Sequence, residues 1–189
     1  MPPSNGAYLD RLMRRESFQA LWPLFALAPK PAKEMTESFS ALEHLRPLMA
    51  EQGPCRVIHV GDGAHARTAA LFALKTEAEN ISVDPLVNVG LVEAWRTRFG
   101  IRRLSWHKAH IDEVCEQLNA LPRMPVVVTF VHAHVHVDKV LDRLTWDAAF
   151  TLACCVPGRQ LTQTRVPHRA GEDLSVLSPH RQYEVLVNR

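Results

Sequence analysis

The sequence lacks a hydrophobic run long enough to cross a bilayer. The longest apolar stretch near its start, residues 20–29, is interrupted by Pro23, whereas a membrane-spanning helix needs about 20 apolar residues. No apolar core followed by a small-residue cleavage site is present near the start either. We therefore expect no membrane association and no secretory leader.

Cysteine is scarce, and none of the cysteines is spaced as in a CxxC metal or redox motif. Cys55 and Cys115 stand apart, and Cys154 and Cys155 are adjacent. This usage is typical of reduced thiols rather than of a disulfide or zinc framework, so we expect a cytoplasmic protein.

An excess of one charge is missing too. The 22 basic residues against 20 acidic ones give a net charge of +2, which neither indicates nor excludes binding to nucleic acid. Hydrophobic residues make up 47% and charged residues 22% of the 189 residues. These values exclude a disordered chain and indicate one globular domain with a short appendage.

The appendage is residues 1–52, which we predict to form an N-terminal helical extension. Apolar residues in 8–22 have helical spacing, and Pro23 is expected to end that helix. Pro29 to Pro31 reads as a linker, and Ser40 with Glu43 three residues later has the pattern of a capping box that begins a second helix. An extension of this kind is suited to contact a protein partner.

From residue 53 to residue 189 short apolar runs alternate with helical patterns, which indicates a parallel sheet covered by helices. We predict strands at residues 55–60, 81–83, 101–106, 125–131 and 148–156, separated by helices at 64–75, 89–99, 111–121 and 137–144. Two further strands at 173–177 and 182–187 leave no room for a helix between them and are expected to pair antiparallel. The predicted fold class is α/β, a doubly wound sheet of about seven strands.

The sequence after the first strand predicts a nucleotide site. That strand runs into a turn with Gly61 and Gly63, where a Cβ would obstruct both the turn and a ligand approaching the backbone N–H groups. Asp84 follows the second strand, 21 residues after Gly63, where a carboxylate can accept hydrogen bonds from ribose hydroxyls.

In these residues the chain resembles class I S-adenosylmethionine-dependent methyltransferases, over roughly residues 40–189. The resemblance implies a Rossmann-like fold with a reversed last strand, Gly61 and Gly63 against the methionine part of the cofactor and Asp84 on its ribose. The motif is degenerate, since His59 stands where the family usually has an acid and His65 where it usually has a third glycine. The further cofactor-binding candidates are His59, Asp62, His65 and His110.

Three alternating histidines, His132, His134 and His136, follow the predicted fourth strand. On one face of an extended segment they could hold a metal ion. We expect instead that His136 lies at the start of the next helix and that no metal is bound. His132 and His134 are then the catalytic candidates, because a neutral imidazole titrates near working pH and can act as general base.

Residues 95–108 are basic and aromatic. The residues of interest are Trp95, Arg96, Arg98, Arg102, Arg103, Trp106 and Lys108. Such a surface can contact RNA phosphates and stack on bases, so RNA is the expected partner and acceptor. The alternative is a solvated face whose tryptophans point inward.

Three functions stay open at this point. The resemblance implies an S-adenosylmethionine-dependent methyltransferase that acts on an O or N nucleophile. The degenerate motif also fits a subunit of that fold that has lost turnover and binds in a ribonucleoprotein or protein complex. Gly61, Gly63 and Ala66 satisfy G-x-G-x-x-A as well, which leaves an NAD-binding oxidoreductase as a remote third.

Overall fold

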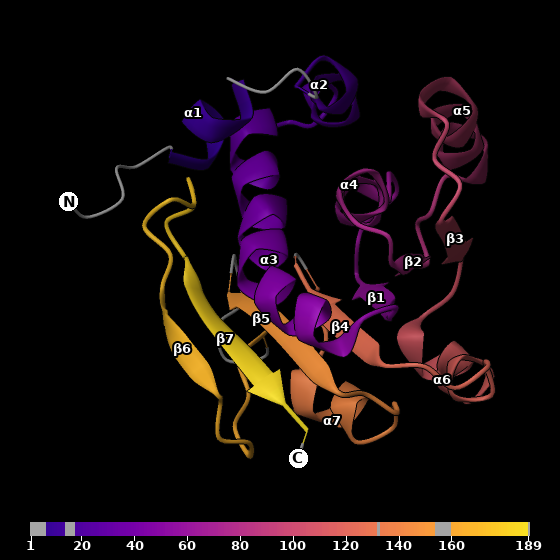
Figure 1. Ribbon diagram of the computed structural model, residues 1–189, viewed down its shortest axis with the longest axis vertical. Coiled ribbons are helices and arrows are strands. Elements are labelled where there is room, and N and C mark those ends of the chain that lie inside the picture. The colour runs from indigo at the N-terminus through magenta and orange to yellow at the C-terminus, as the bar shows by residue number, and fades with distance from the viewer. Residues whose placement is uncertain (1–6, 14–17, 132, 154–159, 189) are drawn as a thin grey trace.

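A seven-stranded sheet forms the centre of the molecule (Figure 1). The computed structural model describes residues 7–13, 18–131, 133–153 and 160–188. The strands are β1 (Arg56–Val60), β2 (Glu79–Val83), β3 (Leu104–His107), β4 (Val126–Phe130), β5 (Ala148–Ala153), β6 (Arg169–Glu172) and β7 (Gln182–Val187).

The strand order is β3-β2-β1-β4-β5-β7-β6. Strands β1 to β5 pair parallel, whereas β7 lies antiparallel to both β5 and β6. The predicted doubly wound, mostly parallel α/β sheet with a reversed last strand is thereby confirmed. In this order β1 and β4 are neighbours at the centre of the sheet. The chain proceeds from β1 towards β3 on one side and from β4 towards β5 on the other, so a crevice opens beyond the carboxyl ends of β1 and β4.

Helices cover both faces of the sheet (Figure 1). They are α1 (Ala7–Met13), α2 (Phe18–Ala26), α3 (Pro31–Gln52), α4 (Arg67–Lys75), α5 (Val89–Phe99), α6 (Ile111–Asn119) and α7 (Val137–Leu141). Figure 1 shows α3, α4 and α5 on one face and α6 and α7 on the other. None of the helices in the described part of the chain combines the length and apolar character needed to span a membrane.

Each face of the sheet has its own hydrophobic core. Val57 of β1 packs with α3, α4 and the inner side of α2, whereas its neighbour Ile58 packs with α6 and α7. This division follows from the alternation of side chains along a strand. β1 and β4 are buried along their whole length and are rich in β-branched residues, as expected for the centre of a parallel sheet.

The predicted helix boundaries in the N-terminal extension are wrong. Pro23 lies inside α2, and the expected linker ends where Pro31 begins α3, which then continues past Ser40 to Gln52. Proline is compatible with the first helical turn, because the N–H that it lacks has no intrahelical acceptor there. Ser40 is not a cap: its hydroxyl donates to Asp173 Oδ2 at 2.6 Å.

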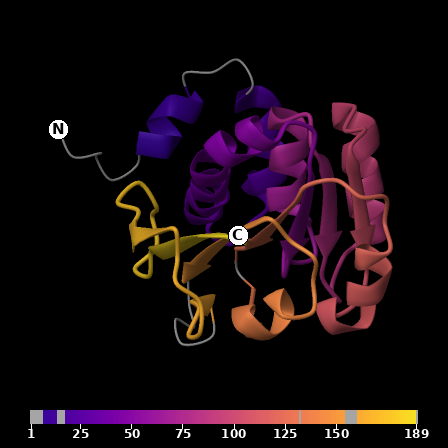
Figure 2. The ribbon, with the colours of Figure 1, turned by 60° about the horizontal axis from the view of Figure 1, so that its bottom comes forward.

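The predicted strand at 173–177 is also wrong, since the partner of β7 is β6, at residues 169–172. Asp173 ends the strand because its own carboxylate turns the chain: Oδ1 accepts from Ser175 N at 3.0 Å. The hairpin made by β6 and β7 then lies beside α1, as both views of the molecule show (Figure 2).

The remaining predicted elements agree with the structure to within a few residues at their ends. At the glycine turn, residues 64–66 precede α4 rather than belonging to it, and β3 likewise begins three residues later than predicted. His132, Cys154 and Cys155 lie outside the described residues.

Candidate functional site

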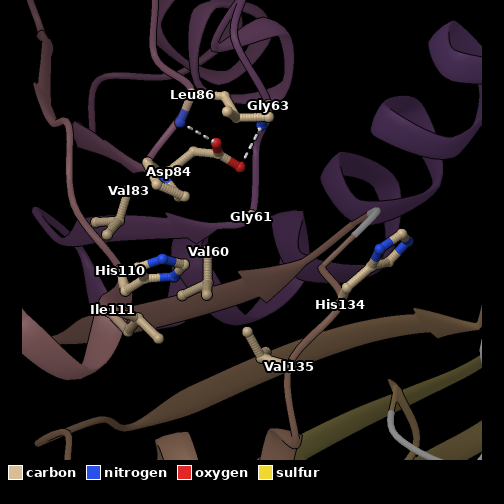
Figure 3. A pocket seen from close by; sticks show the side chains of 11 residues that line it. Val60, Gly61, Gly63, Val83, Asp84, Leu86, His110, Ile111, His134 and Val135 are labelled. Carbon is tan, nitrogen blue, oxygen red and sulfur yellow. Dashed lines mark hydrogen bonds between the residues drawn. The ribbon is translucent and has the colours of Figure 1, made fainter.

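A pocket of about 440 Å³ opens at the carboxyl ends of β1, β2 and β4 (Figure 3). Its volume lies within the range of small-molecule sites, about 300–1,000 Å³. The lining residues are Val60, Gly61, Gly63, Val83, Asp84, Pro85, Leu86, His110, Ile111, His134 and Val135. Five of the predicted site residues, Gly61, Gly63, Asp84, His110 and His134, are therefore brought together.

The two glycines of the turn meet different surroundings. Gly61 has a φ of +68°, and a Cβ there would stand 2.6 Å from Ala133 Cα. The turn therefore has no room for a side chain at this position, because the chain that follows β4 packs directly against it. Gly63 has a φ of +73°, and a Cβ there would meet no atom within 4 Å. Gly63 is also one of the residues that line the pocket.

Asp84 stabilises the turn from the end of β2. Its Oδ2 accepts from Gly63 N at 3.0 Å and its Oδ1 accepts from Leu86 N at 2.7 Å (Figure 3). The residue is only 9% exposed, yet it lines the pocket. A carboxylate has about four acceptor positions, so two remain for hydroxyl groups of a ligand.

The two histidines of the pocket lie on opposite sides of it, with Val60 and Val135 between them (Figure 3). His110 precedes α6, and its backbone N donates to Glu113 Oε2 at 2.8 Å, which fixes the start of that helix. His134 follows β4 and is exposed. His110 and His134 therefore stand on opposite sides of a pocket whose middle is apolar, and the ring of His134 points away from that middle (Figure 3).

Asp62 and His65 do not line the pocket. Asp62 is buried, and its two oxygens accept from Thr68 N at 2.9 Å and Ala69 N at 3.0 Å, so it caps the start of α4. His65 lies near Trp95, with ring centroids 6.4 Å apart. Burial and the neighbouring Arg67 lower the pKa of His65.

His59 also lies outside the pocket, within β1. Its Nδ1 is 2.9 Å from Thr129 Oγ1 and its Nε2 is 3.0 Å from Asn80 Oδ1. Because Asn80 donates its amide to Ala78 O, Oδ1 is an acceptor and Nε2 of His59 carries the proton. Burial lowers the pKa of His59 to about 4, so the ring is neutral and joins three strands.

Sequence reasoning missed the apolar walls of the pocket, formed by residues such as Leu86, Ile111 and Val135. Leu86 is 70% exposed, an unusual position for a leucine in a loop. The only signal for it was its place directly after the Asp84-Pro85 pair. Apolar surface at the rim of a pocket is suited to a flat ring system.

In the basic and aromatic segment, residues 95–108, a tryptophan faces inward, as expected from the alternative prediction of a solvated face. Trp95 is buried, and the guanidinium of Arg96 lies over the ring of Trp106, 5.5 Å from its centroid. Within the part of the chain that the structure describes, no group of His, Cys, Asp and Glu side chains is placed to hold a metal ion.

Solved structures of similar fold include methyltransferases. No protein-family model matches this sequence, and no curated protein matches it. MtNAS in complex with S-adenosylmethionine shares 11% identity over 96% of this chain and 74% of its own, with a TM-score of 0.58. The magnesium protoporphyrin IX methyltransferase ChlM from Synechocystis PCC 6803, with bound S-adenosylmethionine, shares 10% identity over 96% and 95% of the chains, with a TM-score of 0.55.

A third similar structure is the bifunctional kinase-methyltransferase WbdD, at 20% identity over 92% of this chain, with a TM-score of 0.52. This chain spans only 40% of the length of WbdD. The likeness covers the sheet and its helices, including the reversed β7. The chain therefore has the Rossmann-like fold of these structures, and the structures of MtNAS and ChlM hold S-adenosylmethionine.

Proposed function

We propose that this chain binds S-adenosylmethionine in the pocket at the ends of β1, β2 and β4 and transfers its methyl group to an O or N nucleophile. The observation that supports it best is the open pocket in which Gly63 and Asp84 stand side by side, joined by a hydrogen bond of 3.0 Å. A Cβ on Gly63 would project into free space, which is the room that a ligand approaching the turn needs.

The residues present fit the cofactor. Asp84 offers two free acceptor positions for the ribose hydroxyls, and the apolar walls at Leu86 and Ile111 suit an adenine ring. When bound, the cofactor supplies an electrophilic methyl group on a sulfonium. The work of the protein is then to hold the acceptor in line with that methyl group and to exclude water.

His134 is the described residue best placed to act on the acceptor. It lies at the end of β4, on the pocket wall opposite His110. Its imidazole can take a proton from an attacking hydroxyl or amine. His132 stays a catalytic candidate from the sequence alone, since it lies outside the described residues.

RNA remains the proposed acceptor class, supported by the basic residues of the chain rather than by the pocket itself. A cytoplasmic location is part of the same proposal, supported by the buried free thiols of Cys55 and Cys115. The second candidate is a subunit of this fold without turnover. It is favoured by His59, which occupies the usual place of an acid and is turned into the core.

Isothermal titration with S-adenosylmethionine tests cofactor binding. We expect a dissociation constant in the micromolar range, lost in Asp84→Ala and weakened in Asp84→Asn, which keeps the size of the side chain. Asp147→Ala is the matched control, because Asp147 Oδ2 also accepts a backbone hydrogen bond, from Val126 N at 2.8 Å, but at the opposite edge of the sheet. No heat at millimolar ligand would remove the proposal.

Methyl transfer is tested separately, with labelled S-adenosylmethionine and an RNA fraction as acceptor. We expect His134→Ala to lower the turnover by about 10²–10⁴-fold while the affinity for the cofactor is retained. Cofactor binding without transfer to any RNA, protein or small-molecule fraction would favour the subunit without turnover.

A further inference from the structure

A second pocket, of about 320 Å³, lies at the amino ends of β1, β2 and β3. Because β1 is five residues long, roughly 16 Å of strand separates this edge from the candidate cofactor pocket. The charged residues that line the second pocket are Arg56, Glu79, Arg96, Arg102 and Arg103. Four arginines therefore face a single carboxylate.

That carboxylate is already neutralised. Arg56, whose side chain is 5% exposed, donates from Nη2 and Nε to Glu79 Oε2, at 2.9 and 3.2 Å. Its Nη1 donates to Pro122 O at 3.2 Å, so the guanidinium is fixed between two segments. Arg56 and Glu79 cancel, and the other three arginines give the pocket its charge.

Among the described residues, two of those three arginines pair with exposed acidic residues outside the pocket. Arg96 pairs with Glu93, which is 51% exposed, and Arg103 pairs with Glu77, which is 86% exposed. Ion pairs exposed to this degree are weak and easily exchanged. A backbone phosphodiester carries the same single charge as a carboxylate and also accepts paired hydrogen bonds from a guanidinium, so it can exchange with carboxylates that are held this weakly.

The third arginine has no partner to displace. Arg102 is exposed and forms no ion pair with any residue in the described ranges. Arg96 adds an unsatisfied donor, since its Nε is buried and makes no hydrogen bond with them either. Because the Nε of Arg96 is itself buried, the accessible donors that the described residues leave unused are those of Arg102, and these can bind an external anion.

The side chains around the pocket distinguish between two anionic partners, a membrane surface and a nucleic acid. Exposed large apolar side chains are found at Met13, Trp22, Leu27, Leu86, Val89, Val166 and Leu177, and none of these lines the pocket. A membrane surface is therefore a poor match. Trp95 is buried and Trp106 is covered by Arg96, so bases cannot stack there and the contact is to phosphate.

From these observations we infer that the pocket of arginines at the amino edge of the sheet binds the phosphate backbone of a single nucleic-acid strand, independently of its sequence. This inference does not depend on cofactor binding, because the two pockets lie at opposite edges of the sheet. A strand held here is anchored at a distance from the site at which a methyl group would be transferred.

The test is the fluorescence anisotropy of a short labelled oligouridylate mixed with the full chain over a series of salt concentrations. We expect Arg102→Ala/Arg103→Ala to weaken binding about tenfold at low salt and to reduce the slope of log K against log salt by roughly 1.4, for two lost phosphate contacts. Labelled oligothymidylate is expected to behave alike. The control is Arg46→Ala/Arg181→Ala, which removes the same charge from weak ion pairs with Glu43 and Glu172.

Unchanged affinity in Arg102→Ala/Arg103→Ala, or equal weakening in the control, overturns the inference. It is also overturned if the same double variant abolishes binding to phosphatidylserine vesicles but not to oligouridylate. Thermal melts of both double variants serve to check that they are folded. Since no cofactor is added, failure of this test leaves the titration with S-adenosylmethionine unaffected, and the two proposals fail separately.

Discussion

At the scale of single residues, the glycine turn shows two separate requirements. Gly61 is needed because a Cβ there would meet Ala133, whereas at Gly63 only the left-handed backbone, with a φ of +73°, favours glycine. The sequence predicted both positions from the spacing of strand, turn and helix. It could not distinguish them, because the contact of Gly61 is with Ala133, a residue far along the chain.

We expect Gly61→Ala to lower the free energy of unfolding by about 1–3 kcal/mol through overpacking against Ala133, in addition to about 1–2 kcal/mol for the left-handed backbone. Gly100→Ala is the control, since Gly100 has a φ of +62° and open space around its Cβ position. Chemical denaturation measures both. Equal losses in the two variants would show that the contact with Ala133 costs nothing.

A second residue-scale prediction concerns His59. Because its folded pKa of about 4 lies below the ordinary value near 6.5, the unfolded chain binds the proton more readily. The contribution of neutral His59 to the free energy of unfolding is therefore complete above about pH 6.5 and is lost as the pH falls towards 4. We expect this part of the pH dependence of unfolding to disappear in His59→Gln and to persist in His180→Gln, where the histidine is exposed. A curve that keeps its shape in His59→Gln would contradict the assignment.

At the scale of elements, α1 is held to the rest of the molecule by a buried polar cluster. Asp173 Oδ2 accepts from Tyr8 and Ser40 hydroxyls at 2.6 Å each and lies 3.2 Å from His44 Nε2. Burial raises the pKa of Asp173, but these hydrogen bonds outweigh it and lower the pKa to about 2. An aspartate of the C-terminal hairpin thus joins the N-terminal helices.

We expect Tyr8→Phe to destabilise the protein by about 1–2 kcal/mol, because a hydrogen bond to a charged acceptor is lost. Amide exchange in α1 should rise more than that in β1. Tyr183→Phe is the control, since the hydroxyl of Tyr183 makes no hydrogen bond within the described residues. Protection of α1 that stays unchanged in Tyr8→Phe would mean that apolar packing alone holds it.

At the scale of the whole molecule, the alternation of strands and helices was enough to predict the sheet, because apolar periodicity is a local property. The N-terminal helices and β6 were predicted poorly. Their limits depend on distant partners, as when Ser40 donates to Asp173 instead of capping a helix. The same holds for the site: Asp84 could be predicted from its distance to the turn, while the role of His59 as a bridge between β2 and β4 could not.

Cofactor binding should raise the melting temperature of the whole chain. At a ligand concentration of 100 times the dissociation constant the gain is about 2.7 kcal/mol, which for a chain of this size corresponds to roughly 5–11 °C. We expect this shift with S-adenosylmethionine, measured by differential scanning fluorimetry, and its loss in Asp84→Ala. A shift with NAD in its place would support the oxidoreductase reading.

The sheet is open at both sides, since β3 and β6 each have a free edge. Each of these outer strands has only four residues, and β6 begins with Arg169 and ends with Glu172, all of it exposed. Short outer strands resist the addition of further strands from other molecules, and the charged ends of β6 add to this resistance. We therefore expect the protein to be concentrated without its sheets joining into fibrils, although nothing covers β6 on the described part of the surface.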